Sequence, residues 1–334
     1  DIFFAISKQS DDYSRIKRVG SVLNYGSIGY LVKFLLADKL ISSHADTDIT
    51  NPFQRNEDHY ADLVKFDFIF LQHGVISGDL SSWLNKGNKD IKLFVVSSDK
   101  EYQAIIGNRA YGYSPKEVKI TGLPRWDKLK NNPKNKLILA PTYRANLLKS
   151  SNKLGRARSY DPSFKETAYF RFYNRLMNDE RIKTVLEKKD MTAELYVHPN
   201  FSQQSCDFKT NKYFSVNFFP YNYQNAIEEG SLLVSDYSSI SYDFAYLSKP
   251  IIYSQFDVET FYQSHSYTKG QFYDYEKDGF GPVAYTYDKT VHQVVSLVNN
   301  DCKQPEMYQQ RIDSYFNFRD SSNTQRVVDA IMKL

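Results

Sequence analysis

The fold of this chain is decided by residues 232–253, LLVSDYSSISYDFAYLSKPIIY. The apolar run 232–234 predicts a buried strand, and the polar turn 235–239 follows it. Apolar residues at helical spacing then predict a helix over 240–247, which Lys249-Pro250 ends before a second apolar strand, 251–253. The segment is therefore predicted to be a strand–turn–helix–strand unit.

The polar turn carries the hydrogen-bond donors that a phosphate group needs. Free backbone N–H groups at a helix start and the hydroxyls of Ser238 and Ser239 would converge on one point. The same groups also cap helices, so a plain helix cap that uses Asp236 is the alternative. The pattern alone leaves both interpretations open.

Length and composition indicate two domains of ordinary size. The chain has 334 residues, 41% of them hydrophobic, and a net charge of only +4, which argues against a nucleic-acid-binding protein. Its two cysteines, Cys206 and Cys302, offer neither a disulfide framework nor a cysteine metal site and fit a reducing cytoplasm. No apolar run reaches the roughly eighteen residues of a membrane span. Because the chain opens directly on a predicted strand without a Met, we expect that a natural N-terminal part is missing.

The first third of the chain alternates predicted strands and helices, which is typical of a parallel sheet covered by helices. Its clearest strand, residues 66–71, ends in Gln72-His73-Gly74. Ligands bind at the carboxyl ends of strands in such sheets, so His73 is a candidate for chemistry and Gly74 for close approach. A structural role for a lone histidine is the alternative. A strand over 118–121 then leads to Arg125 and Asp127.

A polar, proline-containing run over 130–136 is predicted to link two domains, 1–130 and 136–334. The second domain restarts with a strand that leads to Thr142 and Arg144, and an arginine held at a strand end is a good phosphate clamp. A later strand ends at His198. The other predicted elements are a helix over 170–188, a hairpin-like segment over 213–219 and helices over 291–298, 306–316 and 324–332. We expect the last helix to pack back on the first domain.

Two such domains describe the α/β architecture called GT-B, in which two Rossmann-like domains face each other across a cleft. In order and spacing, the motifs resemble those of the CDP-glycerol glycerophosphotransferase family, the teichoic acid primases and polymerases. They are QHG at 72–74, TGLPRWD at 121–127, APTYR at 140–144, HP at 198–199, SDYSS at 235–239 with Asp243-Phe244, and Lys249-Pro250.

The resemblance implies transfer of glycerol phosphate from CDP-glycerol, or of another polyol phosphate from a donor such as CDP-ribitol. The acceptor would be a hydroxyl of a lipid-linked or polymeric substrate, and CMP would be released, as in teichoic acid or capsule-type polymer synthesis. The first domain would face the acceptor and the second would bind the donor. No carboxylate pair suited to Mg²⁺ stands at the strand ends, so we expect neither a metal nor another cofactor.

His73 would act as general base, because its imidazole is neutral near pH 7. His198 would be both catalytic and donor-binding. The other donor-binding candidates are Thr142, Arg144, Asp236, Ser238, Ser239 and Asp243, and the further cleft candidates are Gly74, Arg125 and Asp127.

Other assignments stay open. A nucleotide-sugar glycosyltransferase could share the architecture, and a non-catalytic polymer-binding module of a larger enzyme is possible, although His73 and His198 argue against it. Since the acceptors of the family are lipid-linked, we expect a cytoplasmic protein bound peripherally to the anionic inner face of the cell membrane. The Arg- and aromatic-rich region 156–175 is the predicted contact, with an amphipathic lid as the alternative.

Overall fold

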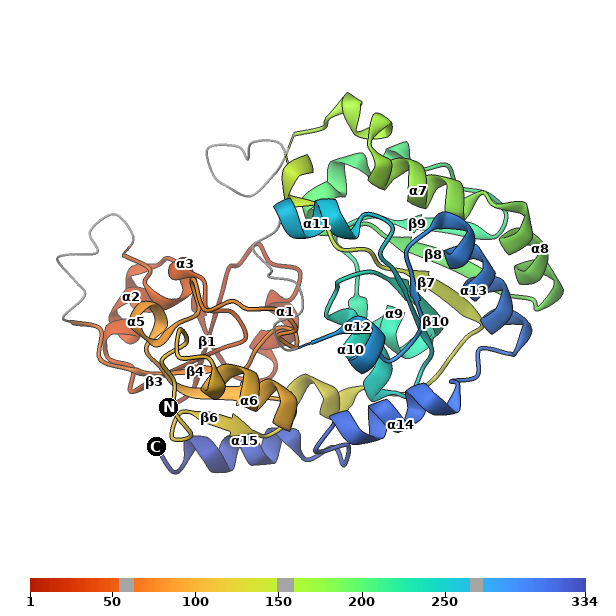
Figure 1. Cartoon of the computed structure of the whole chain (residues 1–334). Helices are drawn as coiled ribbons and strands as arrows, with labels where there is room; N and C mark the ends of the chain where they lie inside the picture. Colours follow the sequence, from red (N-terminus) through yellow and green to blue (C-terminus); the bar gives the residue numbers. More distant parts are fainter. Residues whose placement is uncertain (54–62, 149–158, 265–272) are drawn as a thin grey trace.

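The computed structural model consists of two α/β halves, each built on its own parallel sheet (Figure 1). The structure describes residues 1–53, 63–148, 159–264 and 273–334. The predicted alternation of strands and helices is present in both halves.

The first half contains a four-stranded sheet of order β3-β4-β5-β6 and a separate pair, β1-β2, all with parallel pairing. Its strands are β1 (Phe3–Ile6), β2 (Ser21–Asn24), β3 (Lys39–Ser42), β4 (Asp67–Phe70), β5 (Ile91–Val96) and β6 (Val118–Ile120). Its helices are α1 (Tyr13–Lys17), α2 (Ile28–Leu35), α3 (Thr47–Thr50), α5 (Lys86–Lys89), α6 (Asp99–Gly107) and the 3₁₀ helix η2 (Pro124–Lys128). Strand β4 lies between β3 and β5, which explains why it is a nearly continuous apolar run.

The second half contains a six-stranded parallel sheet of order β12-β11-β10-β7-β8-β9. Its strands are β7 (Lys136–Leu139), β8 (Thr192–Tyr196), β9 (Phe214–Asn217), β10 (Gly230–Ser235), β11 (Ile251–Ser254) and β12 (Val283–Ala284). Its α-helices are α7 (Ala168–Met177), α8 (Glu180–Lys188), α9 (Tyr223–Glu229), α10 (Ile240–Tyr246), α11 (Val258–Ser264), α12 (Tyr275–Asp278), α13 (Tyr287–Asn299), α14 (Glu306–Tyr315) and α15 (Asn323–Ile331), and its 3₁₀ helices are η3 (Ala145–Leu147), η4 (Pro162–Glu166) and η5 (Pro199–Asp207). The unit β10–α10–β11 is the strand–turn–helix–strand unit predicted for residues 232–253.

Two predicted elements are wrong in detail. The helix expected over 170–188 is two helices, α7 and α8, because Asp179 starts a new helix by accepting a hydrogen bond from the N–H of Arg181. The hairpin-like segment expected over 213–219 is instead β9, which pairs in parallel with β8 at the edge of the sheet.

The aromatic residues expected to contact a membrane lie in the core of the second half. Tyr169, Phe170, Phe172 and Tyr173 on α7 are all buried. Arg156 and Arg158 lie outside the described residues. The described part of region 156–175 therefore presents no aromatic patch on α7, and the expectation of a membrane contact there is wrong for this helix.

Helix α15 returns to the first half, beneath β6 in Figure 1. The carboxylate of Asp127 on η2 accepts hydrogen bonds from the backbone N–H groups of Asn323, at 3.0 Å, and Thr324, at 2.7 Å. Gly122 has a φ of +72°, and a Cβ there would lie 2.1 Å from Oδ1 of Asn323. Trp126 stacks on Tyr246 of α10 with ring centroids 4.5 Å apart. One apolar cluster therefore includes side chains from both halves.

Candidate active site where the two sheets meet

The carboxyl end of β4 contacts the start of α10, and this contact joins the two halves at the predicted site. A Cβ at Gly74 would lie 2.3 Å from Oγ and 2.9 Å from Cβ of Ser239. Only a residue without a side chain allows this approach. The contact places His73 next to the turn that carries Ser238 and Ser239.

His73 lies against a second histidine, which the sequence interpretation missed. Its ring stacks on that of His44, which follows β3, with centroids 4.6 Å apart and planes 9° from parallel. His44 could have been found by the rule that identified His73, because it too follows a strand of the parallel sheet. The side chain of His73 is exposed and can reach a substrate.

The surroundings of His73 favour its neutral form. Desolvation by neighbouring protein atoms lowers its pKa, and the nearby positive charges of His44 and Arg125 lower it further, while the Ser43 carbonyl and Asp46 act in the opposite direction. A neutral imidazole can accept a proton, so the ring has the state that a general base needs near pH 7.

On the second half, Arg144 forms a buried ion-pair cluster with two carboxylates. Its side chain, 3% exposed, lies 2.8 Å from Oδ2 of Asp236 and donates to both oxygens of Asp257, at 2.6 and 3.0 Å. Burial opposes the charge of Arg144, but Asp236 and Asp257 outweigh it and raise its pKa. The guanidinium also donates to the Thr142 carbonyl at 2.7 Å. In this geometry Arg144 anchors strand ends, which differs from the expected phosphate clamp.

Asp236 links two strand ends and does not cap α10. Its Oδ1 accepts hydrogen bonds from the backbone N–H groups of Thr142, at 2.8 Å, and Tyr237, at 2.6 Å. These bonds fix the end of β7 beside the end of β10. The helix-cap alternative for Asp236 is therefore wrong. The carboxylate is fully buried and holds the first residues of the turn in place.

The hydroxyl groups of Ser238 and Ser239 make few hydrogen bonds within the protein. Ser239 is the N-cap residue of α10, yet its side chain makes no capping hydrogen bond. Ser238 Oγ accepts only a long hydrogen bond, 3.5 Å, from the N–H of Ile240. Both side chains are partly exposed at the contact with Gly74, so they are available to a ligand.

Thr142 and His198 lie at the same edge of the six-stranded sheet. The ring of His198 contacts that of Tyr143, with centroids 4.7 Å apart. Nδ1 of His198 accepts a hydrogen bond from the N–H of Asn200 at 3.2 Å, so Nε2 carries the proton of a neutral ring. Thr142 Oγ1 is buried and has no hydrogen-bond partner. These two residues stay predicted donor-binding residues.

Asp243 and Asp127 have structural partners. Buried Asp243 accepts hydrogen bonds from Trp126 Nε1, at 2.6 Å, and from Arg125, at 3.0 Å, and so ties α10 to η2. Burial raises its pKa, and Arg125 and Trp126 oppose that rise. Asp127 caps α15. Both carboxylates thus have partners within the protein, and their place at the site stays a prediction, whereas Arg125 lies close enough to lower the pKa of His73.

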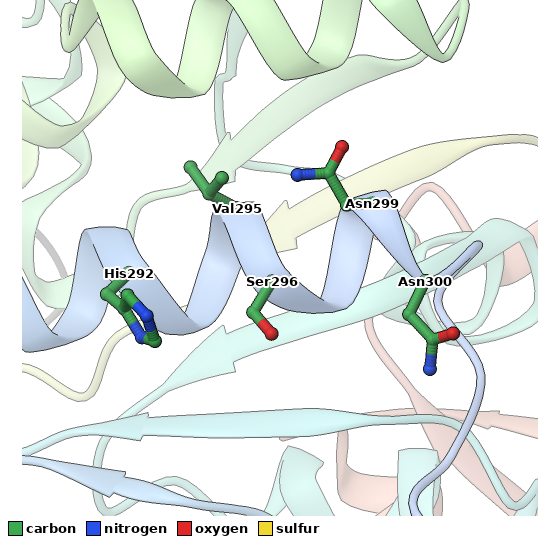
Figure 2. A pocket seen from close by; sticks show the side chains of 5 residues that line it. All are labelled: His292, Val295, Ser296, Asn299 and Asn300. Atoms are coloured by element: carbon green, nitrogen blue, oxygen red, sulfur yellow. The ribbon is translucent and has the colours of Figure 1, made fainter.

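Metal binding and membrane crossing concern residues 1–53, 63–148, 159–264 and 273–334, which the structure describes. Within these ranges no group of three or more His, Cys, Asp or Glu side chains is arranged to hold a metal ion, and no helix has the length and apolarity needed to cross a bilayer. A surface hollow is lined by His292, Val295, Ser296, Asn299 and Asn300. Figure 2 shows that these side chains come from α13 and its C-terminal end, so the hollow includes none of the candidate site residues.

Comparison with known proteins identifies relatives of the whole chain. The sequence profile of the family described as CDP-Glycerol:Poly(glycerophosphate) glycerophosphotransferase matches residues 1–333. The minor teichoic acid biosynthesis protein GgaB of Bacillus subtilis strain 168 is 38% identical over 336 residues, covering 99% of this chain and 36% of GgaB. A teichoic acid ribitol-phosphate primase of Bacillus spizizenii is 24% identical over 228 residues, covering 66% of this chain and 54% of the primase. The chain thus spans about a third of GgaB.

Solved structures share the architecture. The wall teichoic acid polymerase TagF superposes with a TM-score of 0.63 at 16% identity, covering 99% of this chain and 88% of that structure. A UDP-GlcNAc 2-epimerase of Methanocaldococcus jannaschii superposes with a TM-score of 0.51 at 13% identity, covering 94% and 84%. At these identities the likeness concerns the fold, and it confirms the predicted GT-B arrangement of two Rossmann-like units.

Proposed function

Since the chain belongs to the CDP-glycerol:poly(glycerophosphate) glycerophosphotransferase family, as its motifs predicted, we propose that it transfers glycerol phosphate from CDP-glycerol to a hydroxyl of a teichoic acid acceptor. CMP is the second product. The contact between Gly74 and Ser239 carries this proposal, because it brings a neutral histidine next to hydroxyl groups that are free to bind phosphate.

In the proposed reaction, the acceptor hydroxyl attacks the phosphorus atom of the glycerol phosphate group. His73 accepts the hydroxyl proton as the new P–O bond forms, and the bond from that phosphorus to the CMP oxygen breaks. Ser238, Ser239 and Nε2–H of His198 donate hydrogen bonds to the phosphate oxygens, on which negative charge accumulates. Arg144 and Asp236 hold the strand ends that present these donors.

The experiment is a donor panel with the purified chain. CDP-glycerol, CDP-ribitol and UDP-N-acetylglucosamine are each supplied with a short glycerol phosphate oligomer, and released CMP and UDP are separated by chromatography. We expect CMP from CDP-glycerol together with a longer oligomer, and neither product from the His73→Ala variant. Preferential use of CDP-ribitol would reassign the donor, and release of UDP with sugar transfer would replace the proposal by a glycosyltransferase.

We further propose that the protein binds peripherally to an anionic membrane through α2. Ile28, Val32 and Leu36 are 81%, 49% and 73% exposed. Their spacing of four residues forms an apolar stripe along the helix and its C-cap. Beside it, the ammonium group of Lys33 lies 4.7 Å from the ring centroid of exposed Phe3. Apolar side chains that enter the headgroup region next to a cation are typical of interfacial helices.

Vesicle sedimentation tests this surface. Exchanging both Ile28 and Leu36 for Asp should weaken binding to phosphatidylglycerol vesicles about tenfold or more, because two apolar anchors are replaced by charges that the lipid repels. Met307→Asp on α14, which also replaces an exposed apolar side chain, is the matched control and should bind like the wild type. Equal binding by both variants would remove α2 from consideration.

A further inference from the structure

The loop that carries His73 is held by a buried carboxylate, Glu101, in the first turn of α6. Glu101 is 0% exposed, and each of its oxygens accepts two hydrogen bonds. Oε2 accepts from the N–H, at 2.6 Å, and the hydroxyl, at 2.9 Å, of Ser97. Oε1 accepts from the N–H of Ile76 and from Nε2 of Gln72, both at 3.0 Å.

Half of this arrangement is an ordinary helix cap. Ser98-Asp99-Lys100-Glu101 has the sequence of a capping box, and Ser98 Oγ accepts a hydrogen bond from the N–H of Glu101 at 3.2 Å. In such a box the glutamate accepts from the N–H of the N-cap residue, whereas here Oε2 accepts from Ser97, one residue before the cap. The box gives no reason for Oε1 to bind a loop about 25 residues away in sequence.

The two partners of Oε1 lie on either side of His73. Gln72 precedes it with a φ of 61°, a left-handed conformation that a glutamine adopts only when its surroundings hold it there. The same Nε2 also donates to the Val95 carbonyl at 2.6 Å. Ile76 follows, and both Gln72 and Ile76 are buried. Glu101 thus binds both ends of the short segment that contains exposed His73 and buried Gly74.

Burial of this carboxylate carries a cost. Burial raises the pKa of Glu101, and the hydrogen bonds from Ser97, Ile76 and Gln72 oppose that rise. An apolar residue in the same place would avoid the cost but would leave the donors of the loop unpaired. The site therefore uses a carboxylate where four donors must be satisfied at one point.

We propose that Glu101 is a positioning residue, which binds Gln72 and Ile76 and so fixes His73 opposite Ser239. The proposal rests on the function proposed above, because it takes His73 as the base. Glu101 does not touch the substrate. Its effect is on the direction of the imidazole, and a base displaced by about 1 Å can lose on the order of a hundredfold in rate. The donor lies on the other half, so its binding is independent of Glu101.

Two variants separate positioning from helix capping. Gln72→Met keeps the size of the side chain but removes the hydrogen bonds of Gln72 to Oε1 and to the Val95 carbonyl, and leaves that of the Ile76 N–H in place. Ser98→Ala removes the cap of α6 and leaves the bonds to the loop in place. We expect Gln72→Met to lower kcat about ten- to hundredfold with the Kd for CDP-glycerol within about twofold of the wild type. Ser98→Ala should lower the melting temperature with kcat within about threefold of the wild type.

Each outcome decides one question. A kcat for Gln72→Met within threefold of the wild type, or equal losses of kcat in the two variants, would overturn the positioning role. If Gln72→Met does not fold, Glu101→Gln is measured by the same criteria, because an amide can accept from only one of the two donor pairs. If the wild type itself releases no CMP from CDP-glycerol, the proposed function fails. That result differs from a wild type that is active beside variants of unchanged kcat, which overturns only the positioning role.

Discussion

The two strand ends that meet at Gly74 and Ser239 differ in how their charged groups are arranged. On the second half, buried Arg144 pairs with two carboxylates, Asp236 and Asp257. On the first half, exposed His73 stacks on exposed His44 and shares no such pairing. Nearby carboxylates raise the pKa of Arg144 and keep it charged, whereas desolvation and nearby positive charges lower the pKa of His73 and favour its neutral form. The donor side is therefore built for fixed geometry, and the base side for proton transfer.

The largest effect that would test this contrast is expected from the histidines. His73→Ala should lower kcat about a hundredfold to ten-thousandfold and leave the Kd for CDP-glycerol nearly unchanged, because it removes proton transfer only. His198→Ala should weaken donor binding as well as turnover, since His198 lies on the donor side. Single-turnover rates and calorimetric Kd values for the two variants provide the measurement. A His73→Ala variant with weak donor binding and normal kcat would contradict the assignment of the base to the first half and of donor binding to the second.

The second test breaks the buried cluster. Arg144→Met should lower the free energy of unfolding by about 3–5 kcal/mol, because fully buried Asp236 and partly buried Asp257 lose their cation. Arg125→Met is the matched control, since Arg125 also pairs with a buried carboxylate but is itself partly exposed. Urea unfolding followed by circular dichroism measures both. A loss for Arg144→Met no larger than that for Arg125→Met would show that Arg144 is dispensable to the fold.

The third test concerns the contact that joins the two sides. Gly74→Ala should lower the free energy of unfolding by about 1–3 kcal/mol, because the new Cβ overlaps Ser239. Adding Ser239→Gly removes both atoms that the Cβ would meet. The double variant should therefore have a higher melting temperature than Gly74→Ala alone. Additive losses in the double-mutant cycle would mean that the two residues are not in contact.

The smallest effect is expected from His44. Because the charges of His44 and Arg125 lower the pKa of His73 and Asp46 raises it, His44→Ala should move this pKa upward, toward its ordinary value. A larger fraction of His73 is then protonated at acidic pH, so kcat/KM near pH 6 should fall about two- to threefold, with no change near pH 8. A pH profile of kcat/KM measures the shift. If the acidic limb of this profile keeps its midpoint or shifts to lower pH in His44→Ala, the charge of His44 does not lower the pKa of His73.

The parts that could be predicted from the sequence are those with a local signal. Strands buried on both faces are apolar runs, and polar residues after such runs must share one edge of a parallel sheet. His73 and the turn at 235–239 were found in this way. The order of the motifs then indicated the family, which the sequence profile confirms.

The roles of Arg144 and Asp243 could not be predicted, because their partners are distant in sequence. Arg144 binds Asp257, 113 residues later, and Asp243 binds Trp126, 117 residues earlier. A charged residue at a strand end has the same pattern whether it binds a ligand or another side chain. In the folded arrangement both residues form internal pairs, and a part in donor binding stays a prediction. Glu101 had a local signal, the capping box, but that signal describes the bond between its N–H and Ser98 and not the bonds that its carboxylate accepts.

The return of α15 to the first half has a consequence for the order in which the protein folds during its synthesis. Asp127 can bind its partner Thr324 only after a further 197 residues have been added to the growing chain. Until then η2 and Gly122 lack the helix that covers them, although the four-stranded sheet beside them is already complete. The first half therefore leaves the ribosome with an apolar surface uncovered, and it becomes fully native only when the second half has emerged.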